Sequence, residues 1–468
     1  MNLDPAVRLN ATYTPIVPPA GRVAIASESG GLGLAVVTAA SRLNLGLSSG
    51  GNHADVTVND LQEYWEQDPA TGVILLYLQT IVEPQRFRQI AERVGRTKPI
   101  VVLKAGRTEA GQSAAGSHTA AMATNDTAVD ALFKQCGVIR ARTLEEFLAL
   151  ATGLSAQRLP AGRNVGILTN SGGPGVLCAG SCAAEGLTVP ELSKQTQSAL
   201  ASFLPPTTAL RNPVDVIGFA TEDQHAQAVE TMFKADEIDA LIIVHVSVRA
   251  KDNDPVAAGI ARGIRAARQA TGRNKPVYIC WMAEGDLDRK FMIDGETVPT
   301  YQHPEIPVCI ISRAVAYEVW RQQPLGQVPS YSDVDLSKAI SICAKALSER
   351  GSGWLTTEET HALLAAMKLP LVQGAVAASA EDAVKLASKI GFPVAVKLAS
   401  RQILHKTEIG AVRLNLADEQ AVRAAFEAIR SRLAQDHKLD AMEGVLVQPM
   451  LSGGVEVMVG MRRHSPIE

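Results

Sequence analysis

The chain has 468 residues, a length typical of about three domains. Its hydrophobic content is 46% but its aromatic content is only 4%, so its cores must consist mainly of aliphatic side chains, as in layered α/β proteins. The net charge of −3 gives no basic surface for nucleic acid, and the apolar runs have the length of strands, far short of a membrane span.

Strands and helices alternate from the start of the chain. The sequence predicts strands at residues 22–27, 72–79 and 99–106, with helices between them, the first over residues 28–43. The strands are continuous apolar runs, which is typical of a parallel sheet covered by helices on both faces. We therefore expect a doubly wound α/β domain over residues 1–155.

The same order of elements begins again near residue 160. A strand at residues 164–170 leads into a Gly-rich turn and a helix, and another apolar strand follows at residues 240–247. A Lys-Pro dipeptide precedes an apolar strand in both halves, at residues 98–99 and 275–276. The repetition predicts a second domain of the same kind over residues 156–325, consistent with an internal duplication.

A segment rich in Pro, Gly, Gln and Ser predicts a linker over residues 326–350. The remaining residues, 351–468, mix strands and helices without the doubly wound order. A helix is expected at residues 356–367, and the runs at residues 444–451 and 454–461 predict a hairpin around Ser-Gly-Gly. We expect an α+β domain that lacks its closing elements, because the chain stops just after the second run.

A Gly-rich turn follows the first strand of each α/β domain. Glycine lets backbone amides approach an anion, and the amino end of the next helix adds a favourable field. Neither turn has the Gly-Lys-Ser/Thr ending of a P-loop, and a tight turn alone can also require glycine. Because the two turns stand at matching positions, we expect both to bind phosphate, through Ser29, Gly30 and Gly31 and through Ser171, Gly172 and Gly173.

His118 stands among small residues in the stretch from Lys104 to Asp126. This stretch follows a predicted strand and leads into a helix, and loops beyond the carboxyl ends of parallel strands are where α/β folds bind ligands. A neutral imidazole in such a loop can act as a ligand, a base or a nucleophile. Ser117 or Thr119 could form a hydrogen bond with the ring or with a bound phosphate.

A third candidate site lies in the last domain. Lys397 stands on an apolar strand at residues 391–400, where an ammonium group is costly to bury without an anion. The loop after the strand adds His405 and Lys406. These groups predict a place for nucleotide phosphates, although the same composition is compatible with a solvated basic loop.

Together these stretches resemble the NDP-forming acyl-CoA synthetases, the family of ADP-forming acetyl-CoA synthetase and relatives of succinyl-CoA synthetase. GRVAIASESGGLG resembles the phosphate-binding turn of the family's ligase region, and KAGRTEAGQSAAGSHTAAMATND resembles the segment with its phosphorylated histidine. LTNSGGPGVL and LRNPVDVIG are similar to its second ligase domain. GFPVAVKLASRQILHKTEIGAVRLNL and GVLVQPMLSGGVEVMVG are similar to the start of its ATP-grasp domain.

The resemblance implies two flavodoxin-like ligase domains followed by part of an ATP-grasp domain. It also implies an acid–thiol ligase, in which acyl-CoA, ADP and phosphate interconvert with a carboxylic acid, CoA and ATP. An acyl phosphate passes its phosphoryl group to His118, and His405 relays it to the nucleotide. By the same resemblance, nucleotide binding falls to Lys397, Lys406, Gln448 and Glu456.

Three departures from the family pattern limit these expectations. The family usually has a CoA-binding domain before its ligase domains and a later half of the ATP-grasp domain that supplies carboxylates for Mg²⁺, and we expect this chain to lack both. Gln79 stands where family members carry a glutamate that orients the active histidine. An amide can bond to imidazole, but it cannot stabilise a positively charged ring. We assign no metal ligands within the chain.

The expected small-molecule partners are ATP or ADP, Mg²⁺, CoA and a carboxylic acid of unassigned identity. The six cysteines are scattered, and the first residues lack the basic and apolar regions of a signal peptide, so we expect a cytoplasmic protein. A homo-oligomer or an association with a CoA-binding segment is expected, without nucleic-acid or membrane partners.

Two other functions stay open at this point. Some bacterial proteins of this build are lysine acetyltransferases with an added acetyltransferase domain, but their ligase region often lacks the active histidine, which is present here as His118. The other is a scaffold that senses nucleotide or phosphate without turnover.

Overall fold

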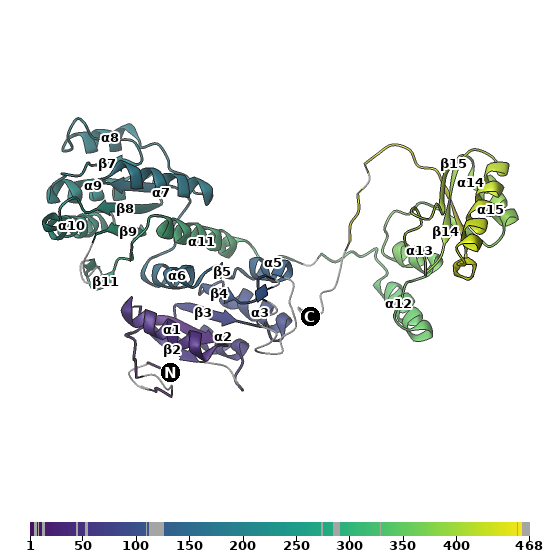
Figure 1. The fold of residues 1–468 in the computed structure, drawn as a ribbon, viewed down its shortest axis with the longest axis horizontal. Helices are drawn as coiled ribbons and strands as arrows, with labels where there is room; N and C mark the ends of the chain where they lie inside the picture. The colour runs from purple at the N-terminus through teal and green to yellow at the C-terminus, as the bar shows by residue number, and fades with distance from the viewer. Residues whose placement is uncertain are drawn as a thin grey trace. The chain divides into compact units, whose positions relative to one another are not determined.

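The computed structural model describes residues 1–3, 7, 9–11, 15–43, 45–51, 55–108, 110–111, 126–272, 275–283, 291–327, 329–455 and 457–460. The described chain divides into two compact units, Met1–Pro324 and Leu325–Gly460 (Figure 1). The first unit contains two five-stranded sheets and a two-stranded hairpin, and the second contains a four-stranded sheet.

A parallel sheet with the strand order β2-β1-β3-β4-β5 forms the first domain. Strands β3 and β4 are almost entirely buried, as their continuous apolar sequences predict. The order 2-1-3-4-5 is that of flavodoxin-like folds, which bind ligands at the carboxyl ends of their strands. The elements are β1 (Ala20–Ser27), α1 (Gly30–Arg42), β2 (Leu47–Gly51), α2 (Val58–Gln67), β3 (Val73–Leu78), α3 (Pro84–Val94), β4 (Ile100–Lys104), α5 (Asp126–Cys136), β5 (Ile139–Ala141) and α6 (Leu144–Ala156).

The second domain repeats this arrangement. Its parallel sheet has the order β12-β9-β8-β6-β7, which read from β7 is again 2-1-3-4-5. The prediction of two similar doubly wound domains is therefore confirmed. The elements are β6 (Val165–Thr169), α7 (Gly172–Ala184), α8 (Lys194–Ala201), β7 (Val214–Asp215), α9 (Glu222–Lys234), β8 (Ala240–Val246), η1 (Ala250–Asp252), α10 (Asn253–Thr271), β9 (Val277–Met282), the hairpin β10 (Met292–Ile293) and β11 (Glu296–Thr297), β12 (Thr300–Tyr301) and α11 (Glu305–Gln322).

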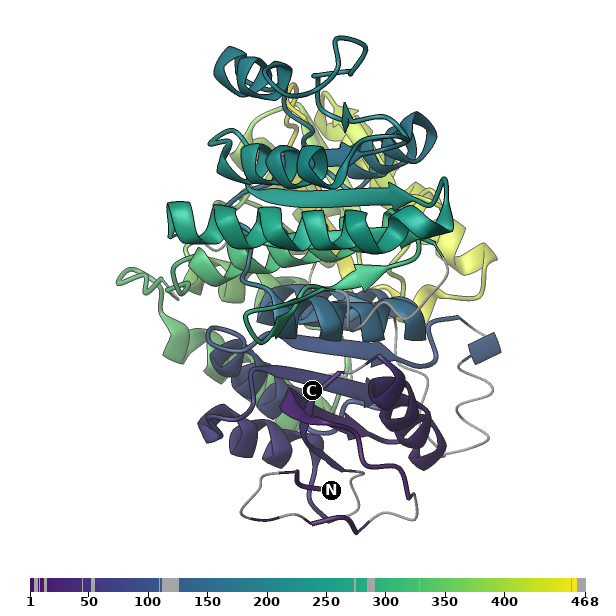
Figure 2. The ribbon, with the colours of Figure 1, turned by 90° about the vertical axis from the view of Figure 1, so that its left-hand side faces the viewer.

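Helices cover both faces of each sheet (Figure 2). Helices α2, α3 and α5 pack on one face of the first sheet, and α8, α9 and α10 pack on the outer face of the second. The remaining helices, α1, α6, α7 and α11, share a single apolar cluster with strands of both sheets. The two domains are thus joined by a common core and form one unit.

Helix α11 also reaches the first domain at its carboxyl end. The Trp320 indole donates to the Gln135 carbonyl (3.0 Å), and the Arg96 guanidinium lies 4.4 Å from the ring centre. The Tyr317 hydroxyl donates to the Gly95 carbonyl (2.6 Å). These contacts fix the last helix of the second domain against the first domain.

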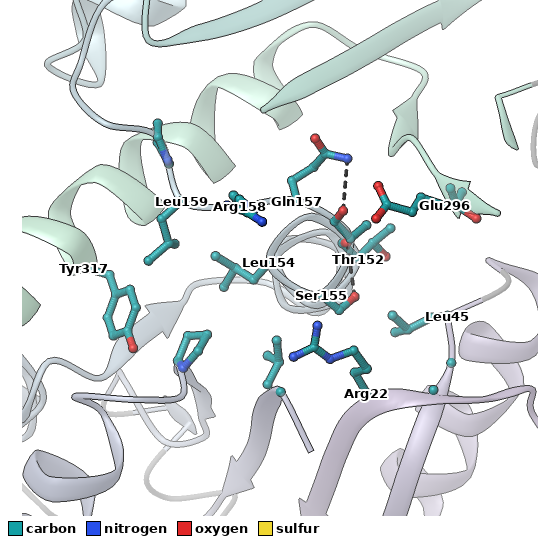
Figure 3. Close-up of a pocket in the computed structure, with 18 of the residues that line it drawn as sticks. Arg22, Leu45, Thr152, Leu154, Ser155, Gln157, Arg158, Leu159, Glu296 and Tyr317 are labelled. Carbon is teal, nitrogen blue, oxygen red and sulfur yellow. Dashed lines mark hydrogen bonds between the residues drawn. The ribbon is translucent and has the colours of Figure 1, made fainter. Parts of the chain in front are cut away.

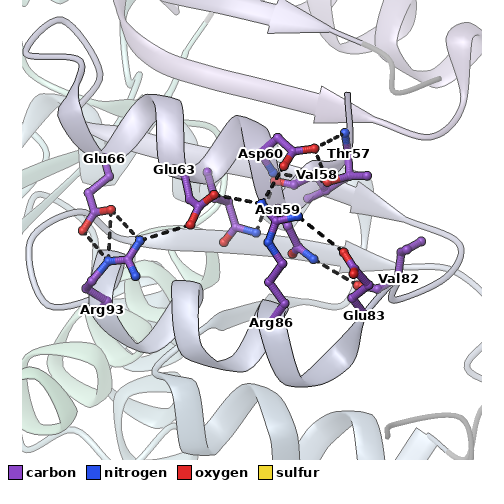
Figure 4. A network of polar contacts seen from close by, with 11 residues as sticks. Thr57, Val58, Asn59, Asp60, Glu63, Glu66, Val82, Glu83, Arg86 and Arg93 are labelled. Atoms are coloured by element: carbon purple, nitrogen blue, oxygen red, sulfur yellow. Dashed lines mark hydrogen bonds and ion pairs between the residues drawn. The ribbon is translucent and has the colours of Figure 1, made fainter. Parts of the chain in front are cut away.

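Ion pairs join α2 to α3 on the surface of the first domain (Figure 4). Arg86 on α3 contacts Asp60 (2.6 Å) and Glu63 (2.9 Å) on α2. Asp60 also completes a capping box with Thr57 at the start of α2. Hydrogen bonds from Thr57 and then from Arg86 lower the pKa of Asp60 to about 2, so its carboxylate stays ionised across the neutral range.

The second unit contains an antiparallel sheet, and two of its helices, α14 and α15, cover one face of that sheet. The order of its strands is β13-β16-β14-β15, and α14 and α15 pack on the sheet around a separate apolar core. The elements are α12 (Leu336–Arg350), α13 (Thr357–Ala366), β13 (Ala375–Ala377), α14 (Ala380–Ile390), β14 (Val394–Ala399), β15 (Val412–Leu416), α15 (Glu419–Gln435), η2 (Leu439–Ala441) and β16 (Gly444–Pro449).

Two sequence predictions in this unit were wrong. Helix α12 occupies Leu336–Arg350, within the range predicted as a linker, because only the start of that range is rich in Pro and Gly; Asp335 caps the helix by accepting the Lys338 amide. The predicted hairpin does not form in the described residues, since residues 451–455 and 457–460 contain no strand. Strand β16 already has β13 and β14 as its two neighbours, which leaves no edge for a hairpin partner.

No helix in the described part of the chain is both long enough and apolar enough to cross a membrane.

Candidate functional site

The first Gly-rich turn connects β1 to α1 at the carboxyl edge of the first sheet. The Ser27 hydroxyl donates to the Ser29 carbonyl (2.7 Å) and accepts the Ser29 amide (3.3 Å). The Ser29 hydroxyl in turn caps α1 by accepting the Leu32 amide (3.3 Å). The positive end of the α1 dipole, at Gly30, therefore lies at the edge where α/β folds bind ligands.

The second turn, between β6 and α7, has the same geometry. The Thr169 hydroxyl donates to the Ser171 carbonyl (2.9 Å) and accepts the Ser171 amide (3.1 Å). Ser171 is the N-cap of α7, but within the described chain its hydroxyl makes no capping bond. This hydroxyl is thus left for a ligand at the amino end of the helix.

Glycines have two different roles in these turns. A methyl group on Gly175 would lie 2.9 Å from the Thr169 side chain, so this glycine allows α7 to pack closely on β6. A methyl group on Gly31 or Gly173 would meet no atom of the described residues within 4 Å. The turns are therefore open at Gly31 and Gly173, as the binding of an anion by backbone amides requires.

The residue before each serine holds the end of the neighbouring strand. Glu28 accepts the backbone amides of Gln79 (2.5 Å) and Thr80 (2.9 Å), just beyond β3. Asn170 binds the equivalent place at the last residue of β8, where it accepts the Val246 amide (2.8 Å) and donates to the Val246 carbonyl (2.8 Å). The same contact is made by a carboxylate in the first domain and by a neutral amide in the second.

Lys104, the last residue of β4, lies beside the contact made by Glu28. Its side chain is only 6% exposed, and Nζ donates to the carbonyls of Gln79 (2.7 Å) and Ala105 (2.8 Å). Burial lowers the pKa of Lys104 below its ordinary value, and Glu28 opposes part of that shift. The peptide group between Gln79 and Thr80 is thus held at its N–H by Glu28 and at its carbonyl by Lys104.

The predicted phosphohistidine segment lies outside the described residues. His118, Ser117 and Thr119 all belong to residues 112–125, so their roles stay predictions. The described chain resumes at Asp126, the first residue of α5. Arg140 on β5 forms an ion pair with Asp126, which fixes the start of this helix against the sheet.

The candidate nucleotide site in the second unit lies on the sheet face opposite to α14 and α15. The neighbours of Lys397 along β14 are buried beneath these helices, so Lys397 points to the other face. Gln448 on β16 pairs with Ala395, two residues from Lys397, and therefore lies on the same face. Its amide donates to the Val372 carbonyl (3.3 Å). The structure thus brings Lys397 and Gln448 to one face, as the predicted site requires.

The loop after β14 adds a second cation near Lys397. Burial lowers the pKa of the Lys406 ammonium, and repulsion from Lys397 lowers it further. His405 is exposed at the surface, where its Nδ1 lies 3.4 Å from a Glu408 carboxylate oxygen. Two mutually repelling lysines are stabilised by an anion between them, so they can hold phosphate. Glu456 lies outside the described residues.

A separate hollow of about 1100 Å³ lies at the opposite edge of the two sheets (Figure 3). It is lined by Arg22 near the start of β1, by the carboxyl end of α6 at Ser155 and by Glu296 of the small hairpin. No predicted phosphate-binding residue lines this hollow. It is therefore not part of the candidate site, which lies at the carboxyl ends of the strands.

Sequence reasoning missed Glu28 and Lys104. The signal for Lys104 was the one that identified Lys397, a lysine at the end of an apolar strand. Glu28 had no comparable signal, because its contact with β3 depends on the order of the strands. Within the described residues, no three or more His, Cys, Asp or Glu side chains gather in a group that could hold a metal ion.

Three family models match the chain in succession. A succinyl-CoA ligase like flavodoxin domain matches residues 20–154, and a Ligase-CoA domain matches residues 165–322. An ATP-grasp domain matches residues 345–466. The first two matches fall on the two flavodoxin-like sheets, and the third falls within the second unit and beyond its described end.

Curated relatives match nearly the whole chain. The ADP-forming 4-hydroxybutyrate–CoA ligase of Nitrosopumilus maritimus is 30% identical over 99% of this chain and 66% of its own length. The ADP-forming acetate–CoA ligase I of Archaeoglobus fulgidus is 31% identical over 98% of this chain and 65% of its own length. The chain thus spans slightly less than two thirds of the length of these relatives.

Two further matches are confined to part of the chain. The alpha subunit of ADP-forming acetate–CoA ligase I from Pyrococcus furiosus is 33% identical over 67% of this chain and 68% of its own length. Acetyl-coenzyme A synthetase 1 of Ca. Korarchaeum cryptofilum, solved in complex with phosphate and ADP, is 31% identical over 67% of this chain and 68% of that chain, with a TM-score of 0.62.

Proposed function

The chain belongs to the family of ADP-forming acyl-CoA synthetases, and from this premise we propose that it acts in an acid–thiol ligase reaction. In this reaction acyl-CoA, ADP and phosphate interconvert with a carboxylic acid, CoA and ATP. The observation that carries the proposal is the pair of equivalent turns, each open at a glycine, at the carboxyl edges of two sheets that share one core. Relatives that use acetate or 4-hydroxybutyrate share this build, so the acid is left unassigned.

The proposed reaction consists of four transfers. Phosphate attacks the thioester carbonyl, the carbon–sulfur bond breaks, and CoA leaves as the thiolate to give an acyl phosphate. A ring nitrogen of His118 then attacks phosphorus, and the carboxylate leaves. A ring nitrogen of His405 next attacks the phosphorus on His118, which breaks the phosphorus–nitrogen bond there. A β-phosphate oxygen of ADP finally attacks the phosphorus on His405, which breaks that phosphorus–nitrogen bond and forms ATP. Imidazole suits this role because it is nucleophilic when neutral near pH 7.

We propose that residues of the first unit bind the phosphate and phosphoryl groups. The amide groups of Gly30, Gly31, Gly172 and Gly173 lie at helix amino ends, where negative charge is stabilised, and the hydroxyls of Ser29 and Ser171 stand beside them. Ser117 and Thr119 are proposed to support His118, and Gln79 to contact the ring.

Residues of the second unit are proposed to bind the nucleotide. Lys397 and Lys406 are proposed to bind the phosphates of ATP or ADP, with Gln448 and Glu456 beside them and His405 as the relay for the phosphoryl group. Mg²⁺ is expected to enter with the nucleotide. Because the described residues gather no group of carboxylates for it, we assign it no protein ligand and no step.

Phosphoryl labelling tests the proposal directly. Incubation of the chain with acetyl phosphate or with ATP, each labelled at the transferable phosphorus, should give an acid-labile and base-stable label on His118. His118→Ala should abolish it, whereas His361→Ala, which changes a histidine of α13 outside the proposed sites, should not. Labelling of His118→Ala at the parent rate would show that another residue carries the phosphoryl group.

A second variant separates the two ends of the reaction. His405→Ala should keep labelling of His118 by acetyl phosphate and lose labelling by ATP, because only the latter passes through the proposed relay. If His405→Ala loses labelling by acetyl phosphate and by ATP to the same extent, His405 is not the relay. A chain with no acid-labile label from either donor would contradict the ligase function itself and favour a non-catalytic sensor.

A further inference from the structure

The buried ammonium group of Lys104 contacts no anion among the described residues. Its two acceptors, the carbonyls of Gln79 and Ala105, are neutral. An ammonium group has three N–H donors, so one is left without a described acceptor. Burying such a charge is costly unless it is paired, and a lysine without a contacting anion is therefore an unusual feature at 6% exposure.

The second domain provides an internal comparison. Strand register makes Leu78 equivalent to His245, because Ser27 pairs with Tyr77 as Thr169 pairs with Val244. Leu78 pairs with Lys104, and His245 pairs with Trp281. The position of Lys104 is thus occupied in the second domain by an indole that is 1% exposed.

This comparison shows what the fold itself requires. In both domains the last strand residue before the turn, Ser27 or Thr169, forms the same two hydrogen bonds with the serine of the turn, and the residue between them accepts an amide at the end of the neighbouring strand. In the second domain Asn170 alone makes both contacts, because its amide accepts the Val246 N–H and donates to the Val246 carbonyl, which is equivalent to the Gln79 carbonyl bound by Lys104. One neutral side chain is therefore enough for the flavodoxin-like frame there. The frame can thus be held without the charges of Glu28 and Lys104, which are an additional feature of the first domain.

The location of Lys104 indicates a role in binding an anion. The residue ends a central strand at the carboxyl edge of the sheet. Glu28, which binds the same peptide group between Gln79 and Thr80, immediately precedes the open turn at Ser29. Lys104 and the turn are thus linked through Glu28 and the backbone of Gln79, and both a helix amino end and an ammonium group attract an anion.

We propose that Lys104 binds an oxygen of a phosphoryl group at the first turn, with Glu28 as the residue that positions it. The ligand class is an inorganic phosphate or phosphoryl oxyanion. Glu28 acts by fixing the peptide group between Gln79 and Thr80, whose carbonyl orients the ammonium group. The inference rests on the proposed function for the identity of the ligand, and it adds a cation that the glycine turns alone do not supply.

Charged groups from several elements face Lys104. Burial lowers its pKa, as does Arg140 on β5, whereas Glu28 after β1 and Asp126 on α5 raise it. The net shift is downward from the ordinary value of 10.5. Since only the protonated group binds an oxyanion well, phosphate affinity should fall as alkaline pH passes through this lowered pKa.

Lys98 offers a matched control for the test. It stands just before β4, at the opposite edge of the same sheet, and its Nζ also donates to two carbonyls, those of Trp65 (2.5 Å) and Asp68 (2.7 Å). Burial lowers its pKa too. A purely structural role for Lys104 predicts that the two lysines behave alike.

The experiment is a calorimetric titration of the full chain with inorganic phosphate. Lys104→Gln should weaken binding by about 10- to 100-fold, the effect of one lost charge-assisted hydrogen bond, and Lys98→Gln should leave it unchanged. Glu28→Gln should weaken binding less than Lys104→Gln. Unchanged affinity in Lys104→Gln, an equal loss in Lys98→Gln, or no saturable phosphate binding by the parent chain would overturn the proposal.

If Lys104→Gln does not fold, phosphate affinity measured over a series of pH values tests the proposal instead. Lys104→Arg keeps a positive charge at all accessible pH, so the alkaline fall in phosphate affinity should disappear in this variant. An alkaline fall with the same midpoint as in the parent would overturn the proposal. The readout is independent of His118: a chain that binds phosphate through Lys104 but never forms phosphohistidine would contradict the proposed function and leave this inference standing.

Discussion

Two lysines on central strands, Lys104 and Lys397, have no contacting carboxylate within the described chain. Lys104 donates only to carbonyls, and Lys397 lowers the pKa of a second lysine, Lys406, by repulsion. In both cases the unfavourable arrangement is relieved by an anion. The two residues therefore mark, by the same physical argument, the two ends of the proposed phosphoryl transfer.

The pair of lysines in the second unit leads to a prediction about ATP. Lys397→Ala should weaken ATP binding by about 1.5–3 kcal/mol, because one charge-assisted contact to phosphate is lost. It should also raise the pKa of Lys406, since the repulsion from Lys397 disappears. Calorimetry with ATP and an NMR titration of the lysine ammonium groups measure the two effects.

Lys385→Ala is the control for this prediction. Lys385 is an exposed residue of α14, on the other face of the sheet, and its nearest acid is Asp382 at 3.5 Å. Its removal should leave ATP binding unchanged. An unchanged affinity in Lys397→Ala would remove that residue from the nucleotide site.

At the scale of elements, the glycines of α7 separate packing from binding. Gly175→Ala should lower the stability of the first unit by about 1–3 kcal/mol, because the new methyl group would lie 2.9 Å from Thr169. Gly173→Ala meets no described atom within 4 Å, so it should keep or slightly raise stability, as alanine does in helices, and weaken phosphate binding by covering the open turn. In thermal unfolding Gly175→Ala should be the less stable variant, whereas in phosphate titration Gly173→Ala should be the weaker binder. If one variant is both the less stable and the weaker binder, this division of roles is contradicted.

The elements also show what sequence could and could not predict. Apolar runs placed β1, β3, β4, β6, β8 and β9 correctly, because these strands are buried on both faces and their sequences record that burial. The other strands of the two sheets, β2, β5, β7 and β12, were not predicted. The hairpin predicted after β16 failed because strand order is a tertiary property: β13 and β14 take both edges of β16. For the same reason, the contact of Glu28 with the end of β3 could not be read from residues 28 and 79, which are far apart in the chain.

At the scale of the whole molecule, the two α/β domains of the first unit are inseparable. One apolar cluster contains helices from both, and α11 contacts the loop before β4 and the end of α5 in the first domain. The second unit has an apolar core of its own. We therefore expect the first unit to unfold as one body, and the two proposed phosphate turns to be held in fixed positions relative to each other.

Trp320 is the residue on which this union can be tested. Its ring packs against Gly137, where even a methyl group would lie 2.2 Å from the indole, and it also contacts Arg96 and the Gln135 carbonyl. Trp320→Ala removes these contacts and should destabilise the first unit by about 2 kcal/mol, as expected for a large side chain that is only partly buried. Trp354→Ala is the matched control, because that indole belongs to the second unit and is 65% exposed. Denaturant unfolding should show a lower midpoint for the first unit in Trp320→Ala alone, with both α/β domains lost together. Two separate transitions within that unit, or an equal shift in Trp354→Ala, would mean that α11 does not join the domains as described.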